Sequence, residues 1–412
     1  MIFIKESAEE LRKTVSQKEF RLLLLIIFSG LLVRLAFYLY FTTDGRADLF
    51  EYGEIARNIL SGNGYSLFWF SGEGLEHTSA EGVTPFPSAY MAPAFSFIIL
   101  PLFLTQNALV THIGFILVQS ILYFLITYLL LKLTINQGGK ALIAAVAVYA
   151  VNPEFIAAFK SPTPVLIYHL LILLFLYLGA GSTDSLKKIV IFGIAAGTGL
   201  LLRFEFLIIA VFVPVSLAVI KRNKSYLLVP LIALCMLTPW IARNYAVFGE
   251  PLLSTSTGLN LYRGNNPYET GTWADEKIDS LIKSLPRDEK FEIHFNAMYM
   301  SEAVNYIDGD LPGFFMKMPE KISGLFFVST GSRAGDLVHN IISALLLIFF
   351  LLYLIKTKGN IEAKTVMTVI LLSTIAVTAV FFSIPRYGTM MRIIFVPFVW
   401  EGVFFIVNKI KK

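Results

Sequence analysis

Apolar runs long enough to cross a lipid bilayer recur along the whole chain, and they constrain the fold more than any other feature. A hydrocarbon core ~30 Å thick needs about 20 residues of apolar helix. Such runs stand near 20–41, 108–131, 141–158, 164–180, 226–242, 337–355, 365–384 and 388–407. One soluble core could not bury this surface, because 56% of the residues are hydrophobic and only 15% are charged. The sequence therefore predicts an all-α polytopic membrane protein.

The stretch 189–220 is too long for one ordinary span and carries Arg203 and Glu205 near its middle. Charges at the centre of a bilayer are costly. A helical hairpin that turns at these two residues places both charges at the membrane surface. It brings the expected number of transmembrane helices to about ten.

The positive charges indicate how the spans are oriented. Residues 91–104 are apolar but short and contain two prolines. If this segment does not cross, every short loop on one side is basic, as is typical of cytoplasmic loops. The basic residues are Lys5, Arg12, Lys13, Lys18, Lys132, Lys140, Lys187, Lys188, Lys221, Arg222, Lys224, Lys356, Lys358, Lys364, Lys409, Lys411 and Lys412. We therefore expect 91–104 to be a re-entrant or interfacial helix on the outer side, with both termini cytoplasmic. The net charge of +5 then reflects loop position, and no nucleic-acid partner is expected.

This topology divides the chain into three parts. Residues 1–242 form an N-terminal transmembrane module, which includes an outer loop at 42–90 and the segment 91–104. Residues 243–336 form a second large outer loop, in which the apolar run at 311–315 predicts an interfacial wedge. Residues 337–412 form the C-terminal transmembrane helices. Two long loops on one side favour chemistry at the extracytoplasmic face of a plasma or inner membrane.

The first outer loop carries an acidic residue at the start of a predicted helix. Residues 49–61 have helical spacing of apolar side chains, and Gly62 and Gly64 end the helix. Asp48 could cap this helix, with Glu51 three residues later completing a capping-box-like pair. A capping carboxylate keeps a second oxygen, so beside a cavity Asp48 could also act as a general base.

Short motifs mark the outer ends of the spans. The first consists of Asp48, Tyr52, Ala56, Gly62, Gly64 and Tyr65, directly after the first span. It is followed by Tyr90-Met-Ala-Pro93, Leu202-Arg203-Phe-Glu205, Pro239-Trp240-Ile-Ala-Arg243-Asn244, Gly264-Asn265-Asn266-Pro267 and Pro385-Arg386-Tyr387. In this order they resemble the GT-C membrane glycosyltransferases, especially the protein O-mannosyltransferases and the lipid A aminoarabinose transferases. The resemblance covers nearly the whole chain and implies a GT-C-like bundle with juxtamembrane helices.

The resemblance implies an inverting glycosyltransferase that uses a sugar on a polyprenyl phosphate as donor. The acceptor would be a hydroxyl of a glycan, a lipid or a protein, and Asp48 stands at the position of the catalytic base. The leaving phosphate needs positive charge, which arginine supplies well. Candidates for the phosphate site are Arg203, Arg243, Arg263, Arg386 and Lys321. We expect Arg243 and Arg386 to form a phosphate clamp; the alternative for each residue is a helix-end side chain that binds headgroups or carbonyls.

Further candidates for supporting or substrate-contacting roles are Tyr52, Tyr90, Glu154, Asn244, Asn265 and Tyr387. Glu154 is the acid nearest to a turn where the family often has one, and it either substitutes there or pairs with Lys160. Arg392 and Glu401, in the last span, are expected to face inward with partners. None of the five histidines pairs at ligand spacing, so no cofactor is predicted, and a divalent cation stays open.

Two other classes of function stay open. A lipid or solute transporter or flippase would account for charged residues within spans, but the chain shows no internal repeat of the kind that many transporters have. A lipid-linked polysaccharide polymerase or ligase would share the donor class, but the Asp48–Tyr52 signature is not expected there. The sequence names neither the sugar nor the acceptor.

Overall fold

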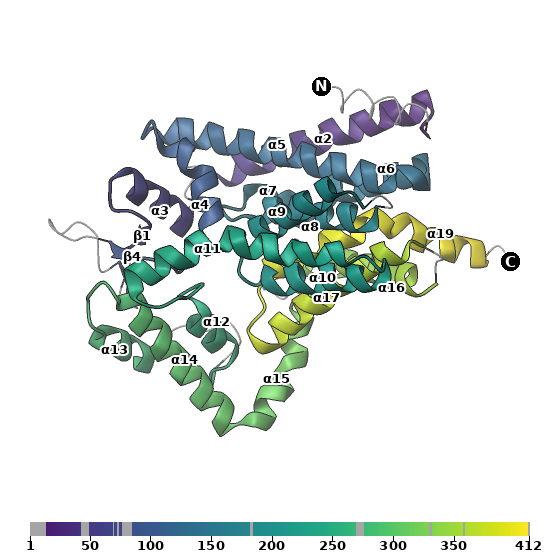
Figure 1. The fold of residues 1–412 in the computed structure, drawn as a ribbon. Coiled ribbons are helices and arrows are strands. Elements are labelled where there is room, and N and C mark those ends of the chain that lie inside the picture. The colour runs from purple at the N-terminus through teal and green to yellow at the C-terminus, as the bar shows by residue number, and fades with distance from the viewer. Residues whose placement is uncertain are drawn as a thin grey trace.

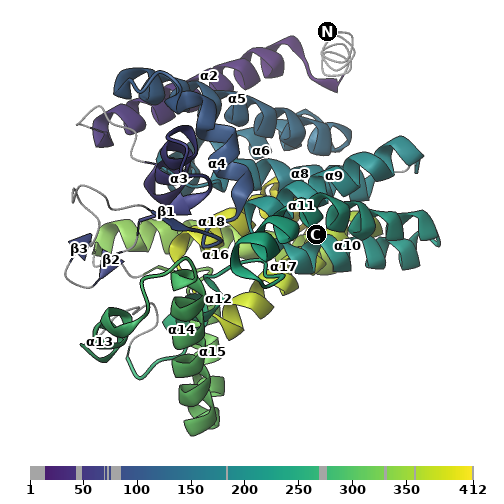
Figure 2. The same ribbon diagram turned by 60° about the vertical axis from the view of Figure 1, so that its left-hand side comes forward.

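The computed structural model describes residues 14–42, 49–68, 70–71, 74–75, 85–181, 184–268, 276–328, 332–356 and 359–410. Long helices lie side by side in a bundle, and shorter helices and loops gather at one end of it (Figures 1 and 2). We call this the loop end. The opposite end is called the terminal end, because α2 (Gln17–Phe41) begins there and α19 (Val399–Ile410) ends there.

The other bundle helices are α5 (Ala108–Thr134), α6 (Gly139–Val151), α7 (Pro153–Lys160), α8 (Val165–Ala180), α9 (Leu186–Leu202), α10 (Phe206–Ile220), α11 (Leu228–Phe248), α16 (Arg333–Lys356), α17 (Ile361–Val380) and α18 (Pro385–Arg392). Short 3-10 helices extend them: η2 (Ile135–Gln137), η3 (Lys224–Leu227) and η4 (Ile393–Phe398). Six helices in the described residues are long and apolar enough to cross a membrane, with mean hydropathies from 1.8 to 2.4. Leucines such as Leu25 and Leu32 are 64% and 65% exposed on the bundle surface, as lipid-facing residues are. The fold is that of an all-α, multi-pass membrane protein.

The total of about ten crossings stays a prediction. α6 and α7 are bent by 55° relative to each other and add a seventh span if they cross together. α8 and α10 are apolar but shorter. α9 ends at Leu202 and α10 begins at Phe206, so the predicted helix break at Arg203 and Glu205 is confirmed.

The apolar segment after the first loop forms two short helices, α4 (Pro93–Ile99) and η1 (Leu100–Phe103). Helix rises ~1.5 Å per residue, so this pair is too short to cross a ~30 Å core. The Thr111 hydroxyl donates to the Leu102 carbonyl at 2.8 Å and holds the start of α5 against η1. The helix bounds agree with the prediction of an interfacial or re-entrant segment at 91–104.

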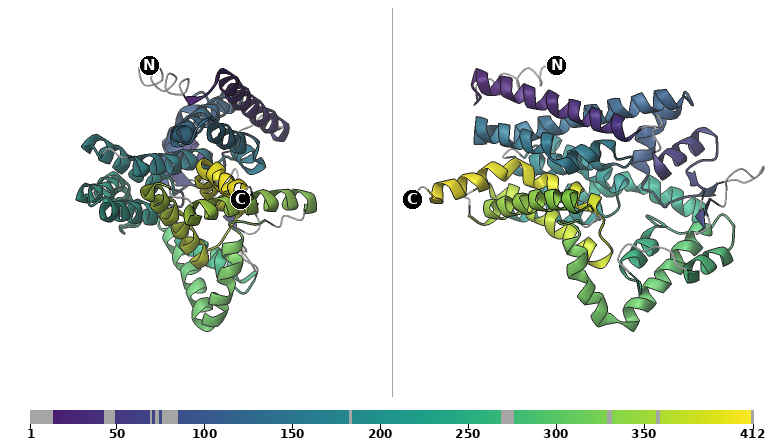
Figure 3. Two further views of the ribbon diagram at one scale, coloured as in Figure 1. Left: turned by 90° about the vertical axis from the view of Figure 1, so that its right-hand side faces the viewer. Right: turned by 180° about the vertical axis from the view of Figure 1, so that it is seen from behind.

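The loop end contains the remaining elements: α3 (Phe50–Leu60), β1 (Ser66–Leu67), β2 (Phe70–Ser71), β3 (Gly74–Leu75), β4 (Phe86–Pro87), α12 (Thr257–Gly264), α13 (Glu276–Ser284), α14 (Phe291–Gly309) and α15 (Leu311–Ser323). β1 pairs antiparallel with β4, and β2 with β3. α12 and α14 share an apolar core that includes Leu259, Tyr262, Phe295 and Tyr299. From this core α14 and α15 form a V that projects from the side of the bundle (Figures 1 and 3).

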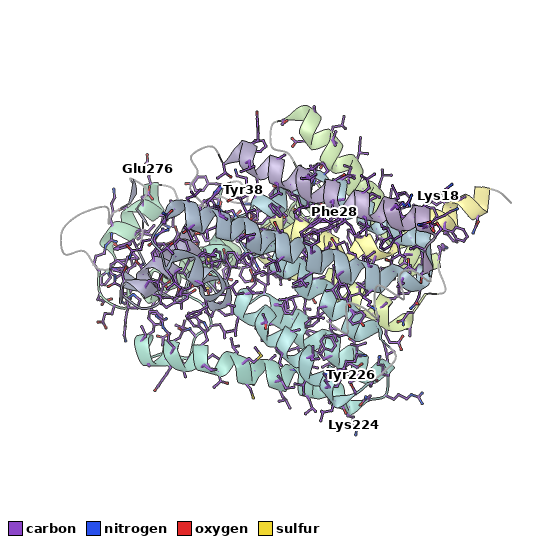
Figure 4. All side chains as sticks on the ribbon, turned by 90° about the horizontal axis from the view of Figure 1, so that it is seen from above. Lys18, Phe28, Tyr38, Lys224, Tyr226 and Glu276 are labelled. Atoms are coloured by element: carbon purple, nitrogen blue, oxygen red, sulfur yellow. The ribbon has the colours of Figure 1, made fainter. Side chains whose placement is uncertain are left out.

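The two ends of the bundle also differ in charge. Seen from above, Lys18 and Lys224 lie at the terminal end and Glu276 lies at the loop end (Figure 4). The predicted basic loops and the predicted long loops are therefore at opposite ends. α11 continues past the predicted loop boundary at Arg243 to Phe248, and Gly249 ends it in a left-handed conformation, with φ 79°.

Candidate functional site

A polar chamber of about 360 Å³ lies at the loop end. Its walls come from the start of α3, the residues before α4, the turn between α9 and α10, α12, and the start of α18. These segments are far apart in the sequence and meet only in the folded chain. Six of the predicted site residues line the chamber: Tyr52, Tyr90, Arg203, Arg263, Arg386 and Tyr387.

Three arginines converge on the chamber. Arg203 follows the last residue of α9, Arg263 lies in the last turn of α12, and Arg386 lies in the first turn of α18. The Arg203 guanidinium lies 4.6 Å from the centre of the Tyr387 ring, and that of Arg263 lies 4.3 Å from the centre of the Phe382 ring. Stacking restrains these planar groups, which then present their N–H donors in fixed directions. The arrangement suits a bound anion such as a phosphate.

Arg203 also forms an ion pair within the chamber wall. One of its terminal nitrogens lies 2.6 Å from Glu205 Oε1. Burial raises the pKa of the Glu205 carboxyl, but the Arg203 guanidinium outweighs this effect and holds the pKa below its ordinary value. Glu205 is therefore ionised at neutral pH and partly neutralises Arg203.

Tyr52 and Tyr90 are hydrogen-bond donors rather than bases. Burial raises the pKa of Tyr52 to about 12 and also raises the pKa of Tyr90. Both phenols therefore stay protonated at neutral pH. The Tyr52 ring packs edge-on against Phe95 at 5.0 Å, which fixes its position between α3 and α4. These hydroxyls could donate to phosphate or sugar oxygens.

Glu51 is a chamber residue that the sequence did not single out as a site. The N-cap of α3 is Leu49, with no side-chain capping bond, so Glu51 is one position short of the capping-box place. Its side chain lines the chamber instead. The next acid, Glu54, accepts a hydrogen bond from the Phe68 N–H at 2.6 Å and does not line it. Asp48 and residues 43–47 lie outside the described residues.

Arg243 and Asn244 lie elsewhere. Arg243 donates to the carbonyls of Ser88 at 2.6 Å and Tyr65 at 2.7 Å, and to the Asn244 amide oxygen at 3.0 Å. Asn244 in turn donates to the Leu252 carbonyl at 2.9 Å. These bonds tie the first loop to the end of α11. The structure therefore brings Arg386 together with Arg203 and Arg263, and not with Arg243.

Lys321 and Asn265 also lie outside the chamber, and they bind each other. The buried Lys321 ammonium donates to Asn265 Oδ1 at 2.8 Å and to the carbonyl of Ala379 at 3.3 Å. The Asn265 amide donates to the Val380 carbonyl at 2.9 Å. This contact joins α15, the end of α12 and the end of α17. It fixes the helix end that carries Arg263.

Glu154 belongs to a buried network that joins α7, α8 and α18. Both its oxygens lie 2.8 Å from Arg392 Nε, and Oε2 accepts from the Thr389 hydroxyl at 3.0 Å. His169 Nε2 lies 2.9 Å from the Thr389 carbonyl. The predicted inward partner of Arg392 is thus Glu154. The suggested Glu154–Lys160 pair is not formed, because the Lys160 ammonium lies over the Phe41 ring. α18 carries Arg392 as well as Arg386, so the network holds one chamber wall in place.

A second, smaller pocket of about 50 Å³ lies next to the chamber, within the bundle. It shares Arg203, Glu205 and Tyr387 with the chamber. Its other walls are mostly apolar and come from α8, α10, α17 and α18, with Ile209 and Val377 among them. A smaller, mostly apolar space therefore adjoins the polar chamber at these three residues.

The described part of the chain contains no group of three or more His, Cys, Asp and Glu residues that could hold a metal ion. The question of a divalent cation stays open, because several acids of the first loop lie outside the described residues.

The fold and the chamber together define a class of protein. The chain is an α-helical, multi-pass membrane protein with an arginine-rich chamber at one end of its bundle. It matches no known protein family and no curated protein sequence.

Proposed function

We propose that the chain is an inverting glycosyltransferase of the GT-C type, which moves a sugar from a polyprenyl phosphate to an acceptor hydroxyl. The observation that carries the proposal is the convergence of Arg203, Arg263 and Arg386 on one chamber. A lipid-linked phosphate that leaves during transfer carries negative charge on its oxygens. Fixed guanidinium groups stabilise that charge as it develops.

In the proposed reaction the acceptor oxygen attacks C1 of the donor sugar from the face opposite the phosphate. The bond between C1 and the phosphate oxygen breaks, the configuration at C1 inverts, and polyprenyl phosphate leaves as an anion held by the arginines. Asp48 takes the acceptor proton. Asp48 precedes the chamber residue Phe50 by two positions in the sequence, which favours this role. Glu51 accepts hydrogen bonds from sugar hydroxyls on the same wall.

The smaller pocket favours a lipid-linked donor over a soluble one. It adjoins the chamber at Arg203 and Tyr387, so a phosphate at the arginines would lie next to an apolar space. The first isoprene carbons of a polyprenyl chain would enter this space, and the rest of the chain would continue into the bilayer between spans. A soluble nucleotide sugar has no apolar portion to place there.

The chamber is proposed to face the extracytoplasmic side of a plasma or inner membrane, with both termini in the cytoplasm. Basic residues gather in and beside the short connections between spans, as Lys18 at the start of α2 and Lys224 at the start of η3 do at the terminal end. This orientation excludes nucleotide sugars as donors, because they are cytoplasmic. It leaves glycans, lipids and exported proteins as acceptors.

The test is a turnover assay with the purified protein in proteoliposomes and a radiolabelled polyprenyl-phosphate monosaccharide. The proposal expects label to pass covalently to an acceptor hydroxyl, with inversion at C1. Movement of intact donor across the bilayer without transfer would instead identify a flippase. En bloc transfer of a long glycan would identify a polymerase or ligase.

A further inference from the structure

The tip of the V between α14 and α15 exposes a cluster of apolar side chains. Leu311 is 51% exposed, Phe315 57% and Met316 80%. Asp310, at the bend, caps α15 by accepting from the Gly313 N–H at 2.9 Å, so the backbone that carries these residues is ordered helix. An apolar cluster at the end of a projecting arm is unfavourable in water and marks a contact surface.

The position of the tip indicates what covers it. Figure 1 and the reverse view in Figure 3 both place the tip beside the bundle, level with the loop-end termini of the spans. The membrane surface lies at this level, because α2 ends at Phe41 and α17 at Val380. Seen along the bundle, the V extends beyond the outline of the spans (Figure 3, left). The tip therefore overhangs lipid rather than the chamber.

One polar side chain near the tip, that of Lys317, binds the protein itself. The Lys317 ammonium donates to the Tyr306 hydroxyl and to the Asn266 carbonyl, both at 2.9 Å. The lysine thus joins the two arms of the V and ties them to the end of α12. The apolar residues are left on the outside of the arm, as in an amphipathic interfacial helix.

Apolar side chains are also exposed beyond α15, where the chain returns to the bundle. After α15 the chain passes Phe327, which is 43% exposed, and enters α16, where Leu337 and Ile341 are 61% and 50% exposed. α15 packs against α17, whose last residue, Val380, is 40% exposed. Exposed apolar side chains therefore lie at both ends of α15, at the tip and at the return to the spans, whereas the exposed residues between them are Pro319, Glu320 and Ser323.

We propose that the tip of the V, Leu311, Phe315 and Met316, is inserted into the headgroup region of the bilayer as an interfacial anchor. The anchor is connected to the chamber through α15. The other end of α15 carries Lys321, which donates to Asn265 at the end of α12, and α12 carries the chamber residue Arg263. Bilayer contact thereby holds one wall of the chamber in position. The inference stands whatever reaction the chamber performs.

The test is depth measurement by spin labelling of the full chain in phospholipid nanodiscs. Native Cys235 is exposed on α11 and is first changed by Cys235→Ser. Single cysteines are then introduced by Phe315→Cys and Met316→Cys, and by Lys277→Cys as a control, since Lys277 is 67% exposed on the polar helix α13. Power saturation compares collision with oxygen, which partitions into lipid, and with a water-soluble nickel chelate.

The proposal expects labels at Phe315 and Met316 to collide more with oxygen than with the nickel chelate, and the label at Lys277 to show the reverse order. Tip labels that collide mainly with the nickel chelate would place the tip in water and overturn the proposal. Tip labels shielded from both reagents and coupled to labels on a second copy would overturn it as well, because protein would then cover the tip.

Discussion

Arg386 and Arg243 have similar places in the sequence motifs but different surroundings in the fold. Arg386 lines the chamber, whereas Arg243 donates to the backbone carbonyls of Ser88 and Tyr65. We expect Arg386→Ala to weaken binding of a polyprenyl-phosphate sugar by about tenfold to a hundredfold, since a lost charge-assisted bond costs about 1.5–3 kcal/mol. The melting temperature of the Arg386→Ala variant should stay close to that of the parent protein.

Arg243→Ala is the matched control and should behave in the opposite way. It removes the guanidinium bonds to both carbonyls, of which that of Tyr65 keeps the Ser88 N–H at 3.0 Å. Unfolding should therefore become easier by about 1–3 kcal/mol, while the folded fraction binds the polyprenyl-phosphate sugar normally. Thermal unfolding and titration calorimetry on both variants measure the two effects. Loss of donor affinity in Arg243→Ala with unchanged stability would move the phosphate site away from the chamber.

Asp48→Asn tests the proposed base directly. The amide has nearly the shape of the carboxylate but cannot accept the acceptor's proton, so turnover should fall about 10²–10⁴-fold with donor binding retained. Glu54→Gln is the control, because Glu54 binds the Phe68 N–H outside the chamber. Glu51→Gln should raise KM more than it lowers kcat, since Glu51 is proposed to bind sugar hydroxyls. Near-normal transfer by Asp48→Asn would exclude Asp48 as the base.

The sequence located individual chamber residues but not their grouping. The helix break at Arg203 and Glu205 was predictable from a local signal, the charges within an apolar run. The end of α3 was predictable from the glycines that follow it. The grouping of Arg203, Arg263 and Arg386 depends on how α9, α12 and α18 pack, which no local pattern encodes. Glu51 was missed because its spacing from Asp48 matched a capping box, and the helix begins one residue later than that pattern requires.

Among the elements, α12 carries Arg263 and packs closely on the end of α17. A β-carbon on Gly264 would collide with the carbonyl group of Phe381. Gly264→Ala must therefore push α12 away from α17 and move Arg263. We expect a loss of about 1–3 kcal/mol of stability, as in overpacked cores, together with weaker donor binding.

Gly309→Ala provides the control for this prediction, because a β-carbon at the end of α14 would meet no described atom within 4 Å. It should leave thermal stability and donor binding unchanged or slightly improved. Equal effects of the two substitutions would show that the contact between α12 and α17 does not position the arginine.

The connection between α9 and its neighbours at the terminal end predicts a pH dependence. Asp184 accepts from the Tyr226 hydroxyl at 2.7 Å and lies 3.1 Å from the Lys221 ammonium. Burial raises the pKa of Asp184, but these hydrogen bonds outweigh it and lower the pKa from 3.8 to about 2. The folded state thus binds fewer protons than the unfolded state between these values. Its stabilising contribution is complete above pH 3.8 and is lost as the pH falls to about 2.

Asp184→Asn should therefore destabilise the protein at pH 7 by about 1 kcal/mol, a value reduced for solvent screening. The difference from the parent should shrink as the pH falls below about 4. Chemical unfolding across this pH range measures it. A difference that stays constant with pH would mean that the carboxylate charge does not contribute.

For the whole molecule, the separation of the basic loops from the long loops predicts a topology. Lys140 and Lys224 are exposed residues at the starts of α6 and η3, and Asp288 is exposed between α13 and α14. The positive-inside rule places the first two in the cytoplasm and the third outside. In a Cys235→Ser background, a cysteine at Asp288 should react with an impermeant maleimide in intact cells. Cysteines at Lys140 and Lys224 should react only after permeabilisation.

The position of Lys224 makes this measurement decisive for the segment 91–104. If that segment crossed the membrane, Lys224 would lie outside and the loop 249–328 would lie inside, so the labelling pattern would invert. The short length of α4 and η1 opposes such a crossing, because ~30 Å of hydrocarbon would leave unpaired backbone groups in lipid. Residues 50–52 precede this segment and Arg203, Arg263 and Arg386 follow it, so a crossing would place the two sets on opposite sides and is incompatible with a single chamber. An inverted pattern would place these arginines in the cytoplasm, where nucleotide sugars are present, and would remove the reason for a polyprenyl-phosphate donor.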